Sequence, residues 1–226
     1  MATLTLSKQA INQAILAFEV GYDKLSEFSY YNKKLTKPTV PAWQTTDSGV
    51  TIGIGFDCGY NTPTEIKNSW SSILPEHQVN SLVKCSGKKR KEAFDLLATV
   101  NDIVVPIEDA LRVFYNTTIY KFGKEALKVY PNLPNIHPVE QSVIVGLVFN
   151  RGNDIDATKD RRKEMRQLVA AIKNDNDAET AQIIRNMKRL WADVKGLRIR
   201  RDVEADLIAQ ADTQLPDNDI LKLIIN

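Results

Sequence analysis

The stretch SGVTIGIGFDCGY, residues 48–60, alternates apolar side chains with glycines and then places a carboxylate beside a cysteine. Glycine inside a straight strand weakens the strand and leaves no side chain to pack. If residues 51–57 formed one strand, Thr51 and Asp57 would lie about 20 Å apart. A three-residue hairpin loop at residues 53–55 would instead bring their side chains to about 5 Å. The stretch therefore predicts a tight hairpin that holds a hydroxyl beside an acid.

The length and composition indicate one globular domain. The chain has 226 residues, of which 43% are hydrophobic and 26% charged, and no Pro/Gly/Ser-rich linker divides it. This composition excludes wholesale disorder, and no stretch resembles a membrane span. Residues 1–13 lack the basic and apolar regions of an export signal. We therefore expect no stable membrane insertion, synthesis in the cytoplasm and, if the target lies elsewhere, delivery by other means.

Cysteines and histidines are few. Cys58 and Cys85 are too few for a disulfide scaffold and have no metal-ligand spacing with His77 or His137. Free thiols are the favoured interpretation, and a Cys58–Cys85 disulfide after delivery to an oxidising compartment stays open. We expect no metal and no cofactor.

The net charge is only +2, but positive charge gathers in the last third of the chain, at residues 161–163 and 188–201. These segments could face an anionic polymer, or they could be solvated helix faces with interspersed acids. No stacking aromatics or groove-reading motif accompanies them, so a nucleic-acid partner is not expected.

The first helix predicts a carboxylate in an unusual position. Ser7 can cap a helix with apolar residues at helical spacing, and Gly21 can end it, which places Glu19 in the last turn. The negative end of the helix dipole disfavours a charged carboxylate there unless a cation compensates. Such a position suits an acid that must hold its proton, although most helix glutamates are merely solvated.

Beyond residue 62 the pattern is mainly helical, and Pro and Gly residues separate the helices. Helices are predicted at residues 65–74, 78–83, 89–99, 107–129, 139–150, 163–173, 178–191 and 200–211. The segment EQSVIVGLVF, residues 140–149, is apolar nearly all round, which is typical of a central buried helix. The predicted fold is α+β, a single domain with a small hairpin lobe at about 18–62 and a helical body at about 63–226.

Several blocks in order resemble a known family. They are FEVGYDKL (18–25), GVTIGIGFD (49–57), VFNRG (148–152), RRKEM (161–165) and the late block MKRLW…GLRIRRDVEADL. Together they resemble phage-type lysozymes, most closely the pesticin-like muramidases found also as toxin domains of type VI secretion effectors. The likeness spans nearly the whole chain and implies a lysozyme-like fold.

The resemblance implies catalytic roles for Glu19 as the acid, Asp57 as the base that activates water, and Thr51 as the hydroxyl that fixes this water. Many phage endolysins carry the second acid before the threonine, so Asp47 is the alternative, although Asp47 also suits a turn. Inversion is favoured over retention, with the two carboxyl groups about 6.5–9.5 Å apart.

Four further residues match the family motifs. Asn150 and Arg151 either border the glycan cleft or serve as a cap and a solvated arginine. Arg200 and Arg201 match a late arginine pair, of which one could form an ion pair with Glu19.

The implied substrate is peptidoglycan, cut between N-acetylmuramic acid and N-acetylglucosamine by a monomer acting in the periplasm or cell wall. A toxin would also have an immunity protein as partner, whereas a phage lysis enzyme would not need one. The alternative from another class is a lysozyme-like protein that binds glycan without cleaving it, or a structural part of a delivery machine.

Overall fold

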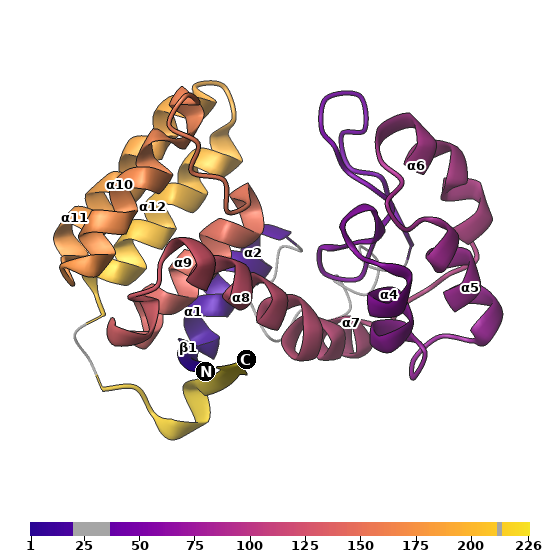
Figure 1. Cartoon of the computed structure of the whole chain (residues 1–226), viewed down its shortest axis with the longest axis horizontal. Coiled ribbons are helices and arrows are strands. Elements are labelled where there is room, and N and C mark those ends of the chain that lie inside the picture. Colours follow the sequence, from indigo (N-terminus) through magenta and orange to yellow (C-terminus); the bar gives the residue numbers. More distant parts are fainter. Residues whose placement is uncertain (20–36, 212–213) are drawn as a thin grey trace. The chain divides into compact units, whose positions relative to one another are not determined.

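The computed structural model describes residues 1–19, 37–211 and 214–226. It is mainly helical, with two small antiparallel strand pairs, so the predicted α+β class is confirmed. The chain divides into two compact units, Met1–Asp23 with Ile119–Asn226, and Lys24–Thr118. Figure 1 shows both units.

The first unit contains both ends of the chain. Its strands are β1 (Ala2–Ser7) and β4 (Ile220–Ile225), and its helices are α1 (Lys8–Ile11), α2 (Ala17–Glu19), α8 (Ile119–Val129), α9 (Pro138–Arg151), α10 (Lys163–Lys173), α11 (Asp177–Asn186) and α12 (Lys195–Ala209). A π-helical segment, Asn12–Leu16, joins α1 to α2, and a 3-10 turn, Met187–Trp191, follows α11.

Helix α9 is buried along nearly its whole length, as its apolar sequence predicts. It packs against β1, α1, α8 and α12. Gly146 permits one close approach, because a Cβ atom at this position would lie 2.8 Å from Ile15 Cγ1. The central helix thus fixes the first helical segment and the C-terminal helices in one core.

The first helical segment begins as predicted. Ser7 Oγ accepts a hydrogen bond from the Ala10 N–H at 3.0 Å, which is an N-cap. The expected single helix contains a π-helical turn, and Glu19 closes its described part. The predicted end at Gly21 lies outside the described residues.

The pairing of the two chain ends was not predicted. Strands β1 and β4 are antiparallel, with Ala2 opposite Ile225 and Ser7 opposite Ile220. Ser7 Oγ also donates to Asp219 Oδ2 at 2.6 Å. The end of strand β1 thus bonds both to β4 and to the turn that precedes β4.

The second unit contains the hairpin, formed by β2 (Thr51–Ile52) and β3 (Phe56–Asp57). Its helices are α4 (Pro63–Trp70), α5 (Glu76–Lys84), α6 (Arg90–Leu96) and α7 (Ile107–Val113), with 3-10 turns at Cys58–Tyr60 and Leu97–Val100 and a π-helical segment at Phe114–Thr118. The predicted helix over 107–129 begins and ends at those residues, but the π-helical segment interrupts it.

The compact units differ from the predicted lobes. The sequence placed the lobe boundary near residue 62, whereas the hairpin unit extends to Thr118. The reason is packing: the Phe56 and Trp70 rings meet edge to face at 5.6 Å, and Gly53 lies against Trp70 and Ala110.

No helix in the described part of the chain is long and apolar enough to cross a membrane.

Candidate active site

The hairpin has the predicted register. Thr51 pairs with Asp57, and Ile52 pairs with Phe56. The backbone reverses at the two glycines between the strands, which have φ values of 58° and 65°. This left-handed conformation favours glycine, because a Cβ atom would clash with the backbone. The glycines therefore place the Thr51 hydroxyl and the Asp57 carboxylate on the same side of a two-stranded ribbon.

Backbone amides on both sides of the hairpin hold the Asp57 carboxylate. The Gly59 N–H donates to Oδ1 at 2.7 Å, and the Gly49 N–H donates to Oδ1 and Oδ2 at 3.1 and 3.0 Å. Asp57 thereby caps the 3-10 turn that follows β3. These bonds fix the orientation of the carboxylate and give it a structural use in the loop.

Thr51 is half-buried, and an isolated antiparallel bridge joins it to Thr39 on the side away from Asp57. Its backbone exchanges hydrogen bonds with Thr39 at 2.7 and 2.9 Å, and its hydroxyl donates to the Gly49 carbonyl at 3.3 Å. The hydroxyl is therefore oriented by the same glycine that holds Asp57.

The alternative acid, Asp47, lies in a different environment. Its Oδ1 forms an ion pair with Arg90 Nε at 2.5 Å, and 58% of its side chain is exposed. Asp57, and not Asp47, is the residue opposite Thr51.

In the other unit, Glu19 has the compensating cation that its place at a helix end requires. Arg200 Nη1 lies 2.6 Å from Glu19 Oε1. The Arg200 side chain is 2% exposed, whereas that of Glu19 is 28% exposed. The arginine that pairs with Glu19 is thus Arg200, and solvent still reaches the carboxylate.

A buried ionic cluster supports Arg200. Glu204 Oε1 accepts from Arg200 Nε at 3.0 Å and from Arg201 Nη2 at 2.8 Å, and both Glu204 and Arg201 are fully buried. Arg201 Nη2 also lies 3.4 Å from Asn150 Oδ1. Burial raises the pKa of Glu204, while Arg201 and Arg200 oppose this shift. The cluster connects α9 and α12 directly behind Glu19.

Arg151 is buried, not solvated. Its guanidinium lies 4.9 Å from the centre of the Trp191 ring and donates to the Arg161 carbonyl. Arg201 lies near the same ring at 5.6 Å. Burial, and next Arg201, lowers the pKa of Arg151 to about 10. Contact of Asn150, Arg151 or Arg200 with a glycan stays a prediction.

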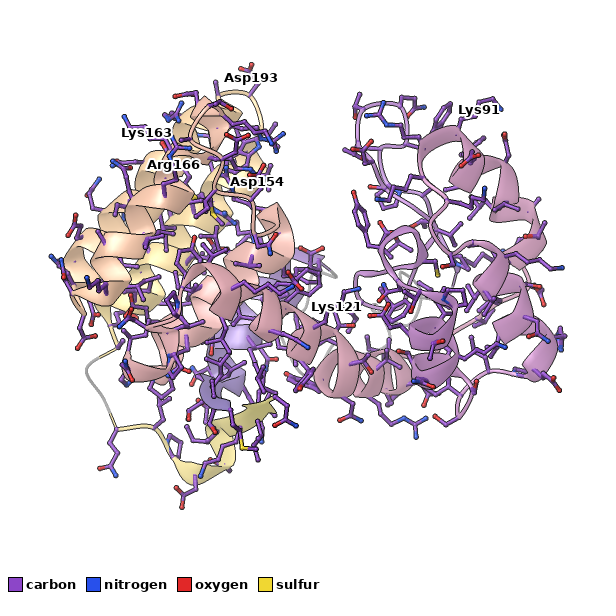
Figure 2. The ribbon with its side chains drawn as sticks, in the orientation of Figure 1. Lys91, Lys121, Asp154, Lys163, Arg166 and Asp193 are labelled. Atoms are coloured by element: carbon purple, nitrogen blue, oxygen red, sulfur yellow. The ribbon has the colours of Figure 1, made fainter. Side chains whose placement is uncertain are left out.

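The basic segments are mostly paired with acids. Arg189 bonds Glu164 and Asp160, and Lys188 lies 2.6 Å from Asp202. Figure 2 labels Asp154, Lys163 and Arg166 at the end of the first unit where α10 begins. The ion pairs of Arg189 and Lys188 agree with the interpretation that the basic segments are solvated helix faces with interspersed acids.

Both cysteines are free and buried. Burial raises the pKa of Cys58 and raises that of Cys85 to about 11. Their thiols therefore stay protonated at neutral pH, as expected for small apolar residues.

Sequence reasoning missed Glu204, the residue on which both arginines depend. Its signal was present, because Glu204 follows Arg200 by four positions and Arg201 by three, and such residues share a helix face.

The chain matches no protein-family model, and no curated protein matches its sequence. The residues themselves thus carry the functional interpretation.

Proposed function

We propose that this protein is a muramidase with a lysozyme-like fold, which hydrolyses the β-1,4 bond between N-acetylmuramic acid and N-acetylglucosamine in peptidoglycan. The observation that carries the proposal is the register of the hairpin, which pairs Thr51 with Asp57. This pair and Glu19 are the three reactive groups that the resemblance to phage-type lysozymes assigns.

Glu19 is the proposed acid that protonates the leaving oxygen. Its partial exposure lets a glycan approach, while the ion pair with Arg200 fixes the direction of the carboxyl group. Glu204 accepts from the same guanidinium, so the charge of Arg200 is shared between two carboxylates. Glu204 thereby holds the Arg200 guanidinium in place beside Glu19.

Asp57 is the proposed base, and Thr51 helps to position the attacking water. Two backbone amides orient the Asp57 carboxylate before substrate arrives, which is the preorganisation that general-base catalysis needs. Asp47 is less suitable, because Arg90 binds it and it does not face Thr51.

Digestion of isolated peptidoglycan sacculi tests this function. The protein should release muropeptides with a reducing N-acetylmuramic acid end, identified by mass analysis. Glu19→Gln should abolish release, and Glu76→Gln, which changes an exposed glutamate of α5, should not. Full release by Glu19→Gln would refute the proposal.

The second acid and the stereochemistry have separate tests. Asp57→Asn should lower release by at least a hundredfold, whereas Asp47→Asn should retain it. An asparagine side chain in place of Asp57 keeps one oxygen that can accept from the same amides, so stability should change little. Inversion requires carboxyl groups about 6.5–9.5 Å apart, and proton NMR of fresh product should then show the α-anomer first.

A second candidate function is glycan binding without cleavage. The observation that favours it is the structural use of Asp57, whose carboxylate caps a turn and need not react. Co-sedimentation with sacculi, without release of any muropeptide by the wild-type protein, would support this candidate and contradict hydrolysis.

The proposed biological role is killing or lysis of a bacterium from the periplasm by a monomeric enzyme. Expression with an added export signal should lyse a Gram-negative host, and expression without it should not. Glu19→Gln should be harmless in both cases. Protection by the product of a neighbouring gene would identify an immunity protein and favour the toxin role over phage lysis.

A further inference from the structure

A group of three carboxylates in the first unit has no part in the proposed hydrolysis. Glu140 lies in the first turn of α9, Asp177 begins α11, and Asp175 lies in the turn between α10 and α11. One carboxylate oxygen of each lies within 4.8 Å of the others. Three like charges this close repel one another unless something compensates.

Glu140 is the unusual member of the cluster. Its side chain is fully buried, and among the described residues neither of its carboxylate oxygens has a hydrogen-bond partner. The start of α9 does not satisfy it, because the Val139 N–H donates to His137 Nδ1 instead. A buried, unpartnered carboxylate is costly, so its persistence calls for a cation or a proton.

The two aspartates are placed by a strained turn. Asp175 is exposed and has a φ of 50°, a left-handed conformation that only a few non-glycine residues adopt. Asn176 then caps α11 by accepting from the Glu179 N–H at 3.1 Å. Asp175 and Asp177 also line a pocket of about 510 Å³ that opens to solvent. The pocket gives room for water and ions beside these two aspartates, which lie next to the buried Glu140.

We propose that Glu140, Asp175 and Asp177 bind one divalent cation, and that this cation is Ca²⁺. Calcium accepts oxygen ligands at about 2.4 Å, so any two oxygens on one ion lie at most about 4.8 Å apart, and the three carboxylates are close enough together to share one ion. The open pocket supplies room for the waters that complete six to eight ligands. Zinc is disfavoured, since the cluster contains neither histidine nor cysteine.

This inference revises the expectation of no metal, which considered only histidine and cysteine spacing. The ion would join the start of the central helix α9 to the turn between α10 and α11, so it would stabilise the core of the first unit. It is independent of the muramidase proposal, because none of its ligands is a proposed catalytic residue.

The competing explanation is a proton shared between two carboxyl groups. Burial, and next Asp177, raises the pKa of Glu140 to about 8 in the metal-free protein. A protonated Glu140 could donate to Asp177 without any ion. The two explanations differ in whether the protein binds calcium at neutral pH.

Calorimetric titration of the full chain, first treated with EDTA and then dialysed, tests the proposal with CaCl₂ as the probe. One Ca²⁺ should bind per chain, and the melting temperature should rise with CaCl₂ but not with NaCl of equal ionic strength. Asp175→Asn and Asp177→Asn should each weaken binding at least tenfold, and Glu140→Gln should abolish it. Asp193→Asn, an exposed aspartate elsewhere in the same unit, is the control and should bind as the wild type does.

Three results would overturn the proposal. They are no binding at millimolar Ca²⁺, binding that all three variants retain, and Mg²⁺ binding tighter than Ca²⁺, which would reject the assigned ion. If Glu140→Gln fails to fold, the exposed Asp175→Asn still decides, because its side chain supports no core packing.

Discussion

Replacing Glu204 by Gln should strongly destabilise the first unit, because Glu204 is the buried carboxylate that Arg200 and Arg201 share. The substitution keeps the shape of the side chain and removes its charge. Arg200 would retain Glu19 as a carboxylate partner. Among the described residues, Arg201 forms an ion pair with Glu204 alone. The consequence is a buried guanidinium whose charge has lost its carboxylate.

The magnitude follows from this burial. Arg201 is fully buried, and its remaining bond to Asn150 is long, at 3.4 Å. Breaking a buried ion pair by removing one partner costs about 3–5 kcal/mol. For a chain of this size the loss corresponds to a fall in melting temperature of about 6–20 °C.

Urea denaturation followed by circular dichroism would measure the free energy of unfolding, with Glu76→Gln as the matched exposed control. Adding Arg201→Met to Glu204→Gln should cost less than the sum of the two single changes, because the unpaired cation is then gone. A Glu204→Gln variant within about 1 kcal/mol of the wild type would refute this account of the cluster.

Three further predictions concern other features. Lys159, and next the Asp156 N–H, lowers the pKa of Asp154 to about 2. The stability that Asp154 contributes is therefore present above pH 4 and lost as the pH falls towards 2. Asp154→Asn should make acid unfolding less steep over that range. Gly53→Ala should cost about 1–2 kcal/mol in thermal unfolding, because φ is +58° and Trp70 lies 2.9 Å from the added Cβ; an unchanged melting temperature would contradict this. Both buried thiols should react with a disulfide reagent only after unfolding, and fast reaction of the native protein would show that they are accessible.

Features with local causes were predictable from the sequence. The hairpin register follows from the two glycines that lie between the paired residues, so the pairing of Thr51 with Asp57 needed no distant information. Helix α10 begins and ends at the predicted residues, because its apolar period and the flanking polar turn are both local. The ion pair of Glu19 with an arginine was predicted, and the structure selects Arg200.

Features that depend on residues distant in the sequence could not be predicted from it. Strand β1 pairs with a strand at the opposite end of the chain, and its alternating Leu4 and Leu6 form too short a pattern to be decisive. Arg151 lies in the last turn of α9, close to where the motif predicts it, but its burial against Trp191 is a tertiary effect. Glu140 was hidden in a segment that reads as apolar, although its burial is now its most informative property.

The antiparallel ribbon of β1 and β4 brings residue 2 next to residue 225. A carrier, tag or further module attached at either end would therefore emerge from the same spot on the first unit. A short glycine-rich bridge could close the backbone into a ring, and new ends could then be opened at an exposed turn without cutting the core. Removing strand β4, in contrast, would leave the backbone N–H and C=O groups of β1 unpaired and able to pair with a strand of another chain.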